Sequence, residues 1–134
     1  MNRENTHKNK KYNVVIHGAS SFTGQIILEY FLENYPPNGR LKWAISGRNY
    51  DKLDASLKKI IGDKSLDNEI PIIIADSKDR ASLDELTMST DVILSTVGPY
   101  AKYGSELVSA CAKNGTDYCD LAGESQWIQK MINK

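Results

Sequence analysis

The sequence lacks several features that would assign it to other classes of protein. Its 17 basic residues equal its 17 acidic residues, so the formal net charge is zero and no overall field attracts nucleic acid or an anionic membrane. No apolar run is long enough for a transmembrane segment, and the opening MNRENTHKNKK has none of the apolar core of a secretory signal. These absences favour a cytoplasmic protein that makes no use of nucleic acid and binds its ligands at a local site.

Cysteine is scarce, and the two that occur form no recognisable motif. Cys111 and Cys119 have neither C-x-x-C spacing nor partnering histidines, so we expect two buried thiols rather than a disulfide or a metal pair. Catalytic signatures are also missing: the sequence offers no Ser-His-Asp set and no tyrosine–lysine pair at helical spacing. It therefore predicts no metal site and leaves the catalytic acid or base unknown.

What the sequence does contain is a regular alternation of apolar runs and helical patterns. Its 134 residues, 40% of them hydrophobic, suit one globular domain. Five strand-like runs, YNVVIH, LKWAIS, IPIIIA, DVILST and TDYCDLA, are each followed by a helical pattern. Strands separated by helices lie parallel, with right-handed crossovers. The fold class is therefore α/β: a doubly wound, three-layer Rossmann-type parallel sheet with strand order 3-2-1-4-5.

The two ends of the chain give expectations about its domain organisation. Residues 1–11 are expected to be a disordered basic tail, the alternative being that they contact phosphates, and residues 12–134 to be the folded domain. Within it, GDKSLDNE at 62–69 is expected to separate the second helix from the third strand. The last helical pattern runs to Lys134, where a dinucleotide-binding sheet ordinarily continues to a sixth strand. We therefore expect a truncated chain whose substrate domain is absent.

The first strand-to-helix turn, Gly18-Ala19-Ser20-Ser21-Phe22-Thr23-Gly24, is the first candidate site. Its glycines let backbone N–H groups point outward at the positive end of the following helix, where a pyrophosphate is favoured. The spacing approximates G-x-x-G-x-x-G, with Ser21 in place of the middle glycine. No Lys-Ser or Lys-Thr follows Gly24, which excludes an NTPase phosphate loop. The alternative is a tight turn that only packs the helix on the sheet.

The next two strand ends carry residues that fit the adenosine half of a dinucleotide. The second strand ends at Gly47 and Arg48, where no acid is available for the ribose hydroxyls and a guanidinium can bind a 2′-phosphate. Alternatively, Arg48 stacks on adenine or is solvated. Asp76, after the third strand, either accepts a hydrogen bond from adenine or caps the helix that begins near Asp79. We therefore predict NADP as the cofactor, with NAD as the alternative.

The ends of the other three strands complete the predicted crevice. The fourth ends in Ser95-Thr96-Val97-Gly98-Pro99-Tyr100, where Gly98 permits close approach and Pro99 stiffens a loop over the nicotinamide side. Glu124, after the fifth strand, is either an active-site carboxylate or a residue favoured by the dipole at a helix start. His17, at the end of the first strand, is interpreted as a buried neutral histidine that holds a backbone group rather than as a catalytic base.

Five segments in this order resemble the motifs of the saccharopine dehydrogenase-like oxidoreductases, a family that includes the trans-acting enoyl reductases. They are GASSFTGQ at 18–25, SGRNYDKL at 46–53, Asp76, STVGPYAKYG at 95–104 and GTDYCDLAGE at 115–124. The likeness extends from Tyr12 to Met131. It implies the amino-terminal, NAD(P)-binding Rossmann domain of such an enzyme.

The resemblance also implies roles for individual residues. The pyrophosphate turn maps to Gly18, Ser20, Phe22, Thr23 and Gly24, the ribose-phosphate contact to Arg48, and the cofactor-covering loop to Val97, Gly98, Pro99 and Tyr100. Ser21 departs from the usual glycine: its side chain narrows the approach to the pyrophosphate, although its hydroxyl is able to donate a replacement hydrogen bond. With these, Gly47, Asp76 and Ser95 complete the predicted cofactor-binding set.

The predicted function is therefore nicotinamide-dinucleotide binding within an oxidoreductase. Family members continue into a second domain, which would hold a small-molecule or lipid-like substrate for hydride transfer and form a homodimer contact. The isolated domain is expected to bind cofactor without turnover. The alternative is a non-catalytic scaffold or redox-sensing module that binds nucleotide weakly. A methyltransferase is a more distant alternative, because that fold also needs an acid at the end of the second strand and none is present there.

Overall fold

The five predicted strands form one parallel sheet. The computed structural model describes residues 10–62 and 70–134, so the expected separator at 62–69, apart from Gly62, and most of the expected tail lie outside the described residues. The strands are β1 (Tyr12–His17), β2 (Trp43–Gly47), β3 (Ile72–Ile74), β4 (Thr90–Ser95) and β5 (Asp117–Asp120). All neighbouring pairs are parallel, in the order β3-β2-β1-β4-β5. This confirms the predicted topology.

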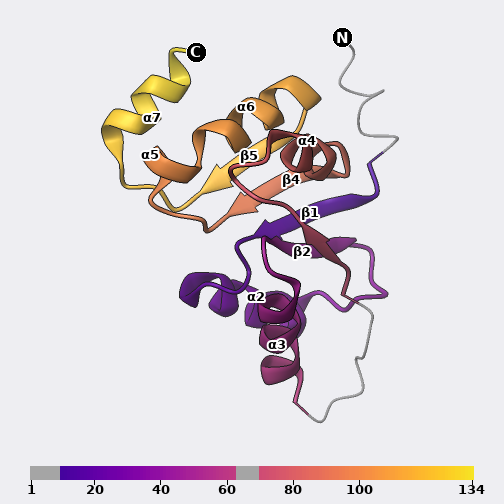
Figure 1. Ribbon diagram of the computed structural model, residues 1–134. Helices are drawn as coiled ribbons and strands as arrows, with labels where there is room; N and C mark the ends of the chain where they lie inside the picture. Colours follow the sequence, from indigo (N-terminus) through magenta and orange to yellow (C-terminus); the bar gives the residue numbers. More distant parts are fainter. Residues whose placement is uncertain (1–9, 63–69) are drawn as a thin grey trace.

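Helices cover both faces of the sheet, as the three-layer prediction requires (Figure 1). They are α2 (Phe22–Asn34), α3 (Tyr50–Ile61), α4 (Arg80–Met88), α5 (Tyr100–Tyr103), α6 (Ser105–Asn114) and α7 (Ser125–Ile132). Successive residues of β1 serve the two faces: Val15 belongs to the core under α4 and α6, and Ile16 to the core under α2 and α3. Both side chains are completely buried, which explains why the strand reads as a continuous apolar run.

Helix α2 packs on the sheet through one side. Ile27 and Phe31 pack against the core around Leu28. Ile26 and Tyr30 are each 55% exposed, because positions 26 and 30 form their own stripe on a neighbouring side of the helix.

Helix α6 ends at Gly115, which is in the left-handed conformation at φ 67°. Two local expectations were wrong in part. Cys111 is buried and both cysteines are free, but Cys119 lies exposed on the edge strand β5, so it is not the buried thiol that was predicted. Lys10, assigned by the sequence to the tail, donates hydrogen bonds from Nζ to the carbonyl oxygens of Thr87 and Asn114. In the part of the chain that is described, no helix is long and apolar enough to cross a membrane.

Candidate functional site

A cleft of about 540 Å³ opens at the carboxyl ends of β1 to β4, the place where strand order reverses. Open parallel sheets bind ligands at this point because the two neighbouring loops diverge to opposite faces. The residues that line the cleft lie at the ends of these four strands and in the segments that follow them. They are His17, Gly18, Ser20, Ser21, Gly47, Arg48, Lys52, Ala75, Asp76, Ser77, Lys78, Thr96, Val97, Gly98, Pro99 and Tyr103.

The cleft brings together most of the predicted cofactor-binding residues. Those that line it are Gly18, Ser20, Ser21, Gly47, Arg48, Asp76, Val97, Gly98 and Pro99. The others lie behind or beside it. Gly24, Ser95 and Tyr100 are buried, whereas Phe22 and Thr23 are exposed on the first turn of α2. The lining also includes residues that the sequence did not indicate as cofactor contacts: His17, Lys52, Ala75, Ser77, Lys78, Thr96 and Tyr103.

Both glycines of the first turn are required by close packing. Gly18 has φ 86°, and a Cβ there would lie 2.7 Å from both Thr96 Oγ1 and Val97 Cγ2. A Cβ on Gly24 would overlap the carbonyl oxygen of Gly18 and lie 2.8 Å from the Cα of Ala19. Gly18 therefore lets the loops after β1 and β4 meet, and Gly24 lets α2 start directly against its own turn.

Ser21 has a structural role that the sequence did not indicate. It is the N-cap of α2, and its Oγ accepts a hydrogen bond from the Gly24 N–H at 2.9 Å. The same Oγ lies 3.2 Å from Thr96 Oγ1, which itself donates to the carbonyl of Gly18 at 2.8 Å. Thr96 Oγ1 also lies 3.1 Å from the carbonyl oxygen of His17, so its one proton serves these two carbonyls and the Ser21 hydroxyl is placed to donate to Thr96 Oγ1. The Ser21 hydroxyl is thus used within the protein rather than kept for a phosphate.

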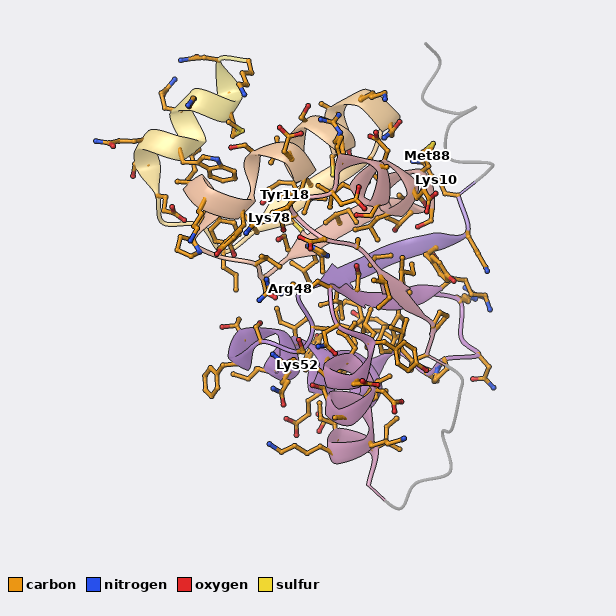
Figure 2. The ribbon with its side chains drawn as sticks, viewed as in Figure 1. Lys10, Arg48, Lys52, Lys78, Met88 and Tyr118 are labelled. Carbon is orange, nitrogen blue, oxygen red and sulfur yellow. The ribbon has the colours of Figure 1, made fainter. Side chains whose placement is uncertain are left out.

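Three cations line the β2–β3 side of the cleft. Arg48 follows β2, Lys52 lies in the first turns of α3 and Lys78 follows β3. Figure 2 shows them one above another, with Arg48 between Lys78 and Lys52. No acid stands at the β2 end, because Asp51 lies within α3. This side of the cleft is therefore suited to an anionic group.

Asp76 lies among these cations but does not cap α4. Its Oδ1 accepts from the backbone N–H of Lys78 at 2.9 Å, which forms a tight turn after β3. The N-cap of α4 is Asp79, whose side chain accepts from the Ser82 N–H. The capping alternative for Asp76 was therefore wrong, and its carboxylate remains at the cleft.

His17 is buried beneath the cleft floor. Its Nδ1 lies 3.1 Å from Ser46 Oγ, and its Nε2 has no hydrogen-bond partner among the described residues. Burial lowers the pKa of His17 to about 4, although the negative charge of Asp76 acts in the other direction and raises that pKa. The ring is therefore neutral near pH 7, as predicted, although it contacts a serine side chain rather than the backbone group expected. Its low basicity does not favour a general base.

The loop after β4 is held from behind by residues of the β5–α7 segment. Tyr100 is buried, and its hydroxyl donates to the carbonyl of Ser95 and accepts from the Leu121 N–H, both at 3.3 Å. Glu124 is the N-cap residue of α7, but its side chain makes no cap bond there. Its carboxylate accepts instead from the N–H groups of Tyr100 and Ala101 on α5. Glu124 thus stands at the start of α7, as one of its two sequence interpretations has it, but its hydrogen bonds serve the start of α5.

Tyr103 reaches the cleft from α5. A hydrogen bond with Lys102 and the nearby charges of Lys102, Lys78 and Arg48 lower the pKa of the Tyr103 phenol. Tyr103 thus lines the same cleft as Lys78 and Arg48. Among residues 10–62 and 70–134, no group of three or more His, Cys, Asp or Glu is arranged to hold a metal ion.

The residues present fit an NADP molecule. Gly18 and Ser20 line the cleft at the turn between β1 and α2, where dinucleotide-binding sheets hold the pyrophosphate. At one end of the cleft the cations Arg48 and Lys52 suit a 2′-phosphate, and at the other Val97, Gly98 and Pro99 offer a largely apolar loop. The sequence and the geometry therefore indicate the same ligand class.

Comparison with known proteins supports this assignment. A family model described as the saccharopine dehydrogenase NADP binding domain matches residues 14–134. A Caenorhabditis elegans protein named lipid droplet localized protein is 38% identical over 125 residues, covering 92% of this chain and 29% of that relative. The Homo sapiens saccharopine dehydrogenase-like oxidoreductase is 39% identical over 128 residues, covering 91% of this chain and 30% of the relative.

A solved structure shows the same fold. Apo saccharopine dehydrogenase (L-Glu forming) from Saccharomyces cerevisiae superposes with a TM-score of 0.62 at 17% identity, over 90% of this chain and 24% of that one. The chain thus spans about 30% of the length of the curated relatives named above. The matched family model, the strand order and the relatives agree, and the chain belongs to the NADP-binding domain family of the saccharopine dehydrogenase-like oxidoreductases.

Proposed function

We propose that the cleft binds NADP(H) in one defined orientation and presents its nicotinamide for hydride transfer within a longer oxidoreductase. The observation that carries the proposal is the single cleft in which Arg48, the Gly18 turn and the Gly98 loop line successive parts. Because the pyrophosphate belongs at the first turn and the ribose phosphate at the β2 end, the nicotinamide is assigned to the β4 end.

The adenosine end is assigned to Arg48 and Lys52. A guanidinium matches a phosphate with two parallel hydrogen bonds, and an adjacent ammonium adds a second positive charge. Lys78 faces the same space from the β3 side. These charges favour the 2′-phosphate of NADP, whereas NAD presents only a hydroxyl there. We therefore propose a preference for NADPH over NADH.

The pyrophosphate is assigned to the start of α2. Helix geometry leaves the first backbone N–H groups without an intrahelical acceptor. Ser21 satisfies the one on Gly24, so the N–H groups of Phe22 and Thr23 are the donors that we assign to the phosphate oxygens. The positive end of the helix dipole adds to this attraction.

The nicotinamide end is assigned to the loop of Val97, Gly98 and Pro99. When bound there, the cofactor supplies the hydride or accepts it. The chain's own contribution is to hold the ring against an apolar loop and keep water from one of its faces. Substrate and reaction direction would depend on residues outside this chain.

Titration calorimetry with NADPH and NADH tests the proposal. We expect NADPH to bind more tightly, and Arg48→Ala and Lys52→Ala to weaken NADPH binding by about 10- to 100-fold, the effect of losing a charge-assisted hydrogen bond, while NADH binding changes little. The matched control is Lys59→Ala, which removes an exposed lysine from the last turn of the same helix. Equal affinities for the two cofactors, unchanged by Arg48→Ala, would contradict the assignment.

Several properties of the longer protein are also part of this proposal. We propose a small-molecule or lipid-like substrate bound by a further domain, a homodimer formed through that domain, and action in the cytoplasm. Two free cysteines are consistent with a reducing compartment, and the name of the Caenorhabditis elegans relative is consistent with lipid chemistry. Fractionation of cells that express the longer protein separates cytosol from lipid droplets: recovery only with the droplets would contradict the cytoplasmic assignment.

A further inference from the structure

We infer that Glu124 is a positioning residue for the nicotinamide half of the cofactor. Its carboxylate holds the start of α5 and through it fixes the Val97–Pro99 loop that lines the cleft. The inference rests on the proposed function, because it assigns the nicotinamide to that loop.

The contact is a two-pronged carboxylate cap supplied from a distant segment. Glu124 Oε2 accepts from the Tyr100 N–H at 2.7 Å, and Oε1 accepts from the Ala101 N–H at 3.0 Å. Pro99, the N-cap residue of α5, makes no side-chain cap bond. Glu124 therefore replaces a local cap, and its negative charge lies at the positive end of the helix.

The same arrangement argues against a catalytic role for Glu124. Each of its two carboxylate oxygens accepts a backbone N–H. A general base needs an oxygen within reach of the proton that it removes from the substrate, and these oxygens are directed at α5. Glu124 thus acts through the loop rather than on a bound ligand.

Aromatic packing reinforces the contact from the same side. Tyr100 stacks on Trp127 of α7 with ring centroids 5.7 Å apart. Trp127 Nε1 donates to Ser105 Oγ, and a Cβ on Gly104 would lie 2.8 Å from the Trp127 ring. The region after β5 therefore supports α5 by hydrogen bonds at its start and by close packing at its end.

The effect of Glu124 is confined to one half of the cleft. The Val97–Pro99 loop runs directly into α5, so displacement of the first α5 residues moves the loop. The adenosine end is built on β2, α3 and the turn after β3, and β1 and β4 separate those elements from β5. Loss of the Glu124 carboxylate is therefore expected to weaken the nicotinamide contact and leave the 2′-phosphate contact intact.

Two ligands distinguish this role from general stabilisation. Adenosine 2′,5′-bisphosphate carries the 2′-phosphate but no nicotinamide, whereas NADPH carries both. By calorimetry, we expect Glu124→Ala to weaken NADPH binding about tenfold, the scale of one charge-assisted hydrogen bond, and to leave the bisphosphate affinity unchanged. Glu124→Gln keeps one acceptor oxygen and should lie between wild type and Glu124→Ala. Glu85→Ala, an exposed glutamate on α4, is the control and should match wild type with both ligands.

Three other results have distinct meanings. Wild-type NADPH affinity in a folded Glu124→Ala variant would overturn the inference. An equal loss for both ligands in Glu124→Ala and Glu124→Gln, with a lower melting temperature, would also overturn it and make Glu124 a general stabilising residue. Failure of the wild-type chain to bind either ligand would overturn the proposed function, and the inference with it.

Discussion

Ser21 Oγ lies 3.2 Å from Thr96 Oγ1, so the turn after β1 and the turn after β4 are joined through their side chains at the middle of the cleft. Ser21 also caps α2. Replacing Ser21 with Ala removes both contacts and is expected to lower the free energy of unfolding by about 1 kcal/mol, whereas Gly, which is tolerated at N-caps, should cost less. Urea denaturation measures both. Ser125→Ala, at an exposed serine of α7, is the control.

The Ser21 variants also test its relation to the cofactor. A free hydroxyl facing the phosphate would make both variants bind NADPH more weakly in proportion to the lost hydrogen bond, while steric crowding would make Ser21→Gly bind more tightly. Because the Ser21 hydroxyl already contacts the Gly24 N–H and the Thr96 hydroxyl, we expect the free energy of NADPH binding to change less than the free energy of unfolding. A change in affinity of tenfold or more in a stably folded variant would refute this.

The sequence predicted the sheet well because strand order depends on patterns that are local and repeated. Continuous apolar runs such as Val14–Ile16 and alternating helices leave few right-handed arrangements. The residues that escaped prediction depend on contacts between distant segments. Nothing near Glu124 reveals that it caps a helix 23 residues earlier in the chain, and nothing near Lys78 reveals that it lines the same cleft as Tyr103.

The same substitution at two glycines should separate folding from binding. A Cβ on Gly24 would overlap the backbone oxygen of Gly18, so Gly24→Ala must displace α2 and is expected to lose about 1–3 kcal/mol of stability. The atoms nearest to a Cβ on Gly98 belong to Tyr100, at an ordinary 3.5 Å or more, so Gly98→Ala should fold with nearly wild-type stability. Because Gly98 lines the cleft where the nicotinamide is assigned, we expect the variant to bind NADPH more weakly. Thermal unfolding and calorimetry on each variant measure the two effects.

Gly123 provides the control for this pair. A Cβ there has no neighbouring atom within 4 Å, so Gly123→Ala should change neither quantity appreciably. If Gly98→Ala lost stability while its NADPH affinity stayed at the wild-type value, Gly98 would be a structural turn residue instead of a cofactor contact.

His17 predicts how stability depends on pH. Its folded-state pKa is lowered from 6.5 to about 4, so between these values the unfolded chain binds a proton that the folded chain excludes. The free energy of unfolding therefore falls as pH decreases from 6.5 towards 4, by up to about 3 kcal/mol in all. His17→Gln removes this contribution. Urea denaturation at pH 7.5, 5.5 and 4.5 should show a steeper loss for wild type than for the variant, and parallel curves would contradict the burial of a neutral ring.

Lys10 is expected to contribute to the stability of the folded domain, although the sequence assigns it to the tail. Its Nζ donates to the carbonyl of Thr87 at 2.8 Å and of Asn114 at 3.1 Å, and to Thr116 Oγ1 at 2.8 Å. Thr87 and Asn114 belong to the last turns of α4 and α6, where unpaired carbonyls and the helix dipole both favour a cation. One ammonium thus joins the ends of two neighbouring helices to the start of the sheet.

Replacement of this ammonium tests where the folded domain begins. Lys10→Met keeps the aliphatic stem but removes the charge and its three hydrogen bonds, and should lower the free energy of unfolding by about 1–2 kcal/mol. Lys11 is exposed, and its ammonium lies 5.6 Å from the Tyr12 ring centroid, a contact of small value at the surface, so Lys11→Met is the matched control and should change stability by less than about 0.5 kcal/mol. If the two variants were equally stable, Lys10 would not contribute to the folded domain and would belong to the tail that the sequence predicted. A loss confined to Lys10→Met would instead move the domain boundary to residue 10, because the carbonyls that it satisfies belong to helices more than 75 residues further along the chain.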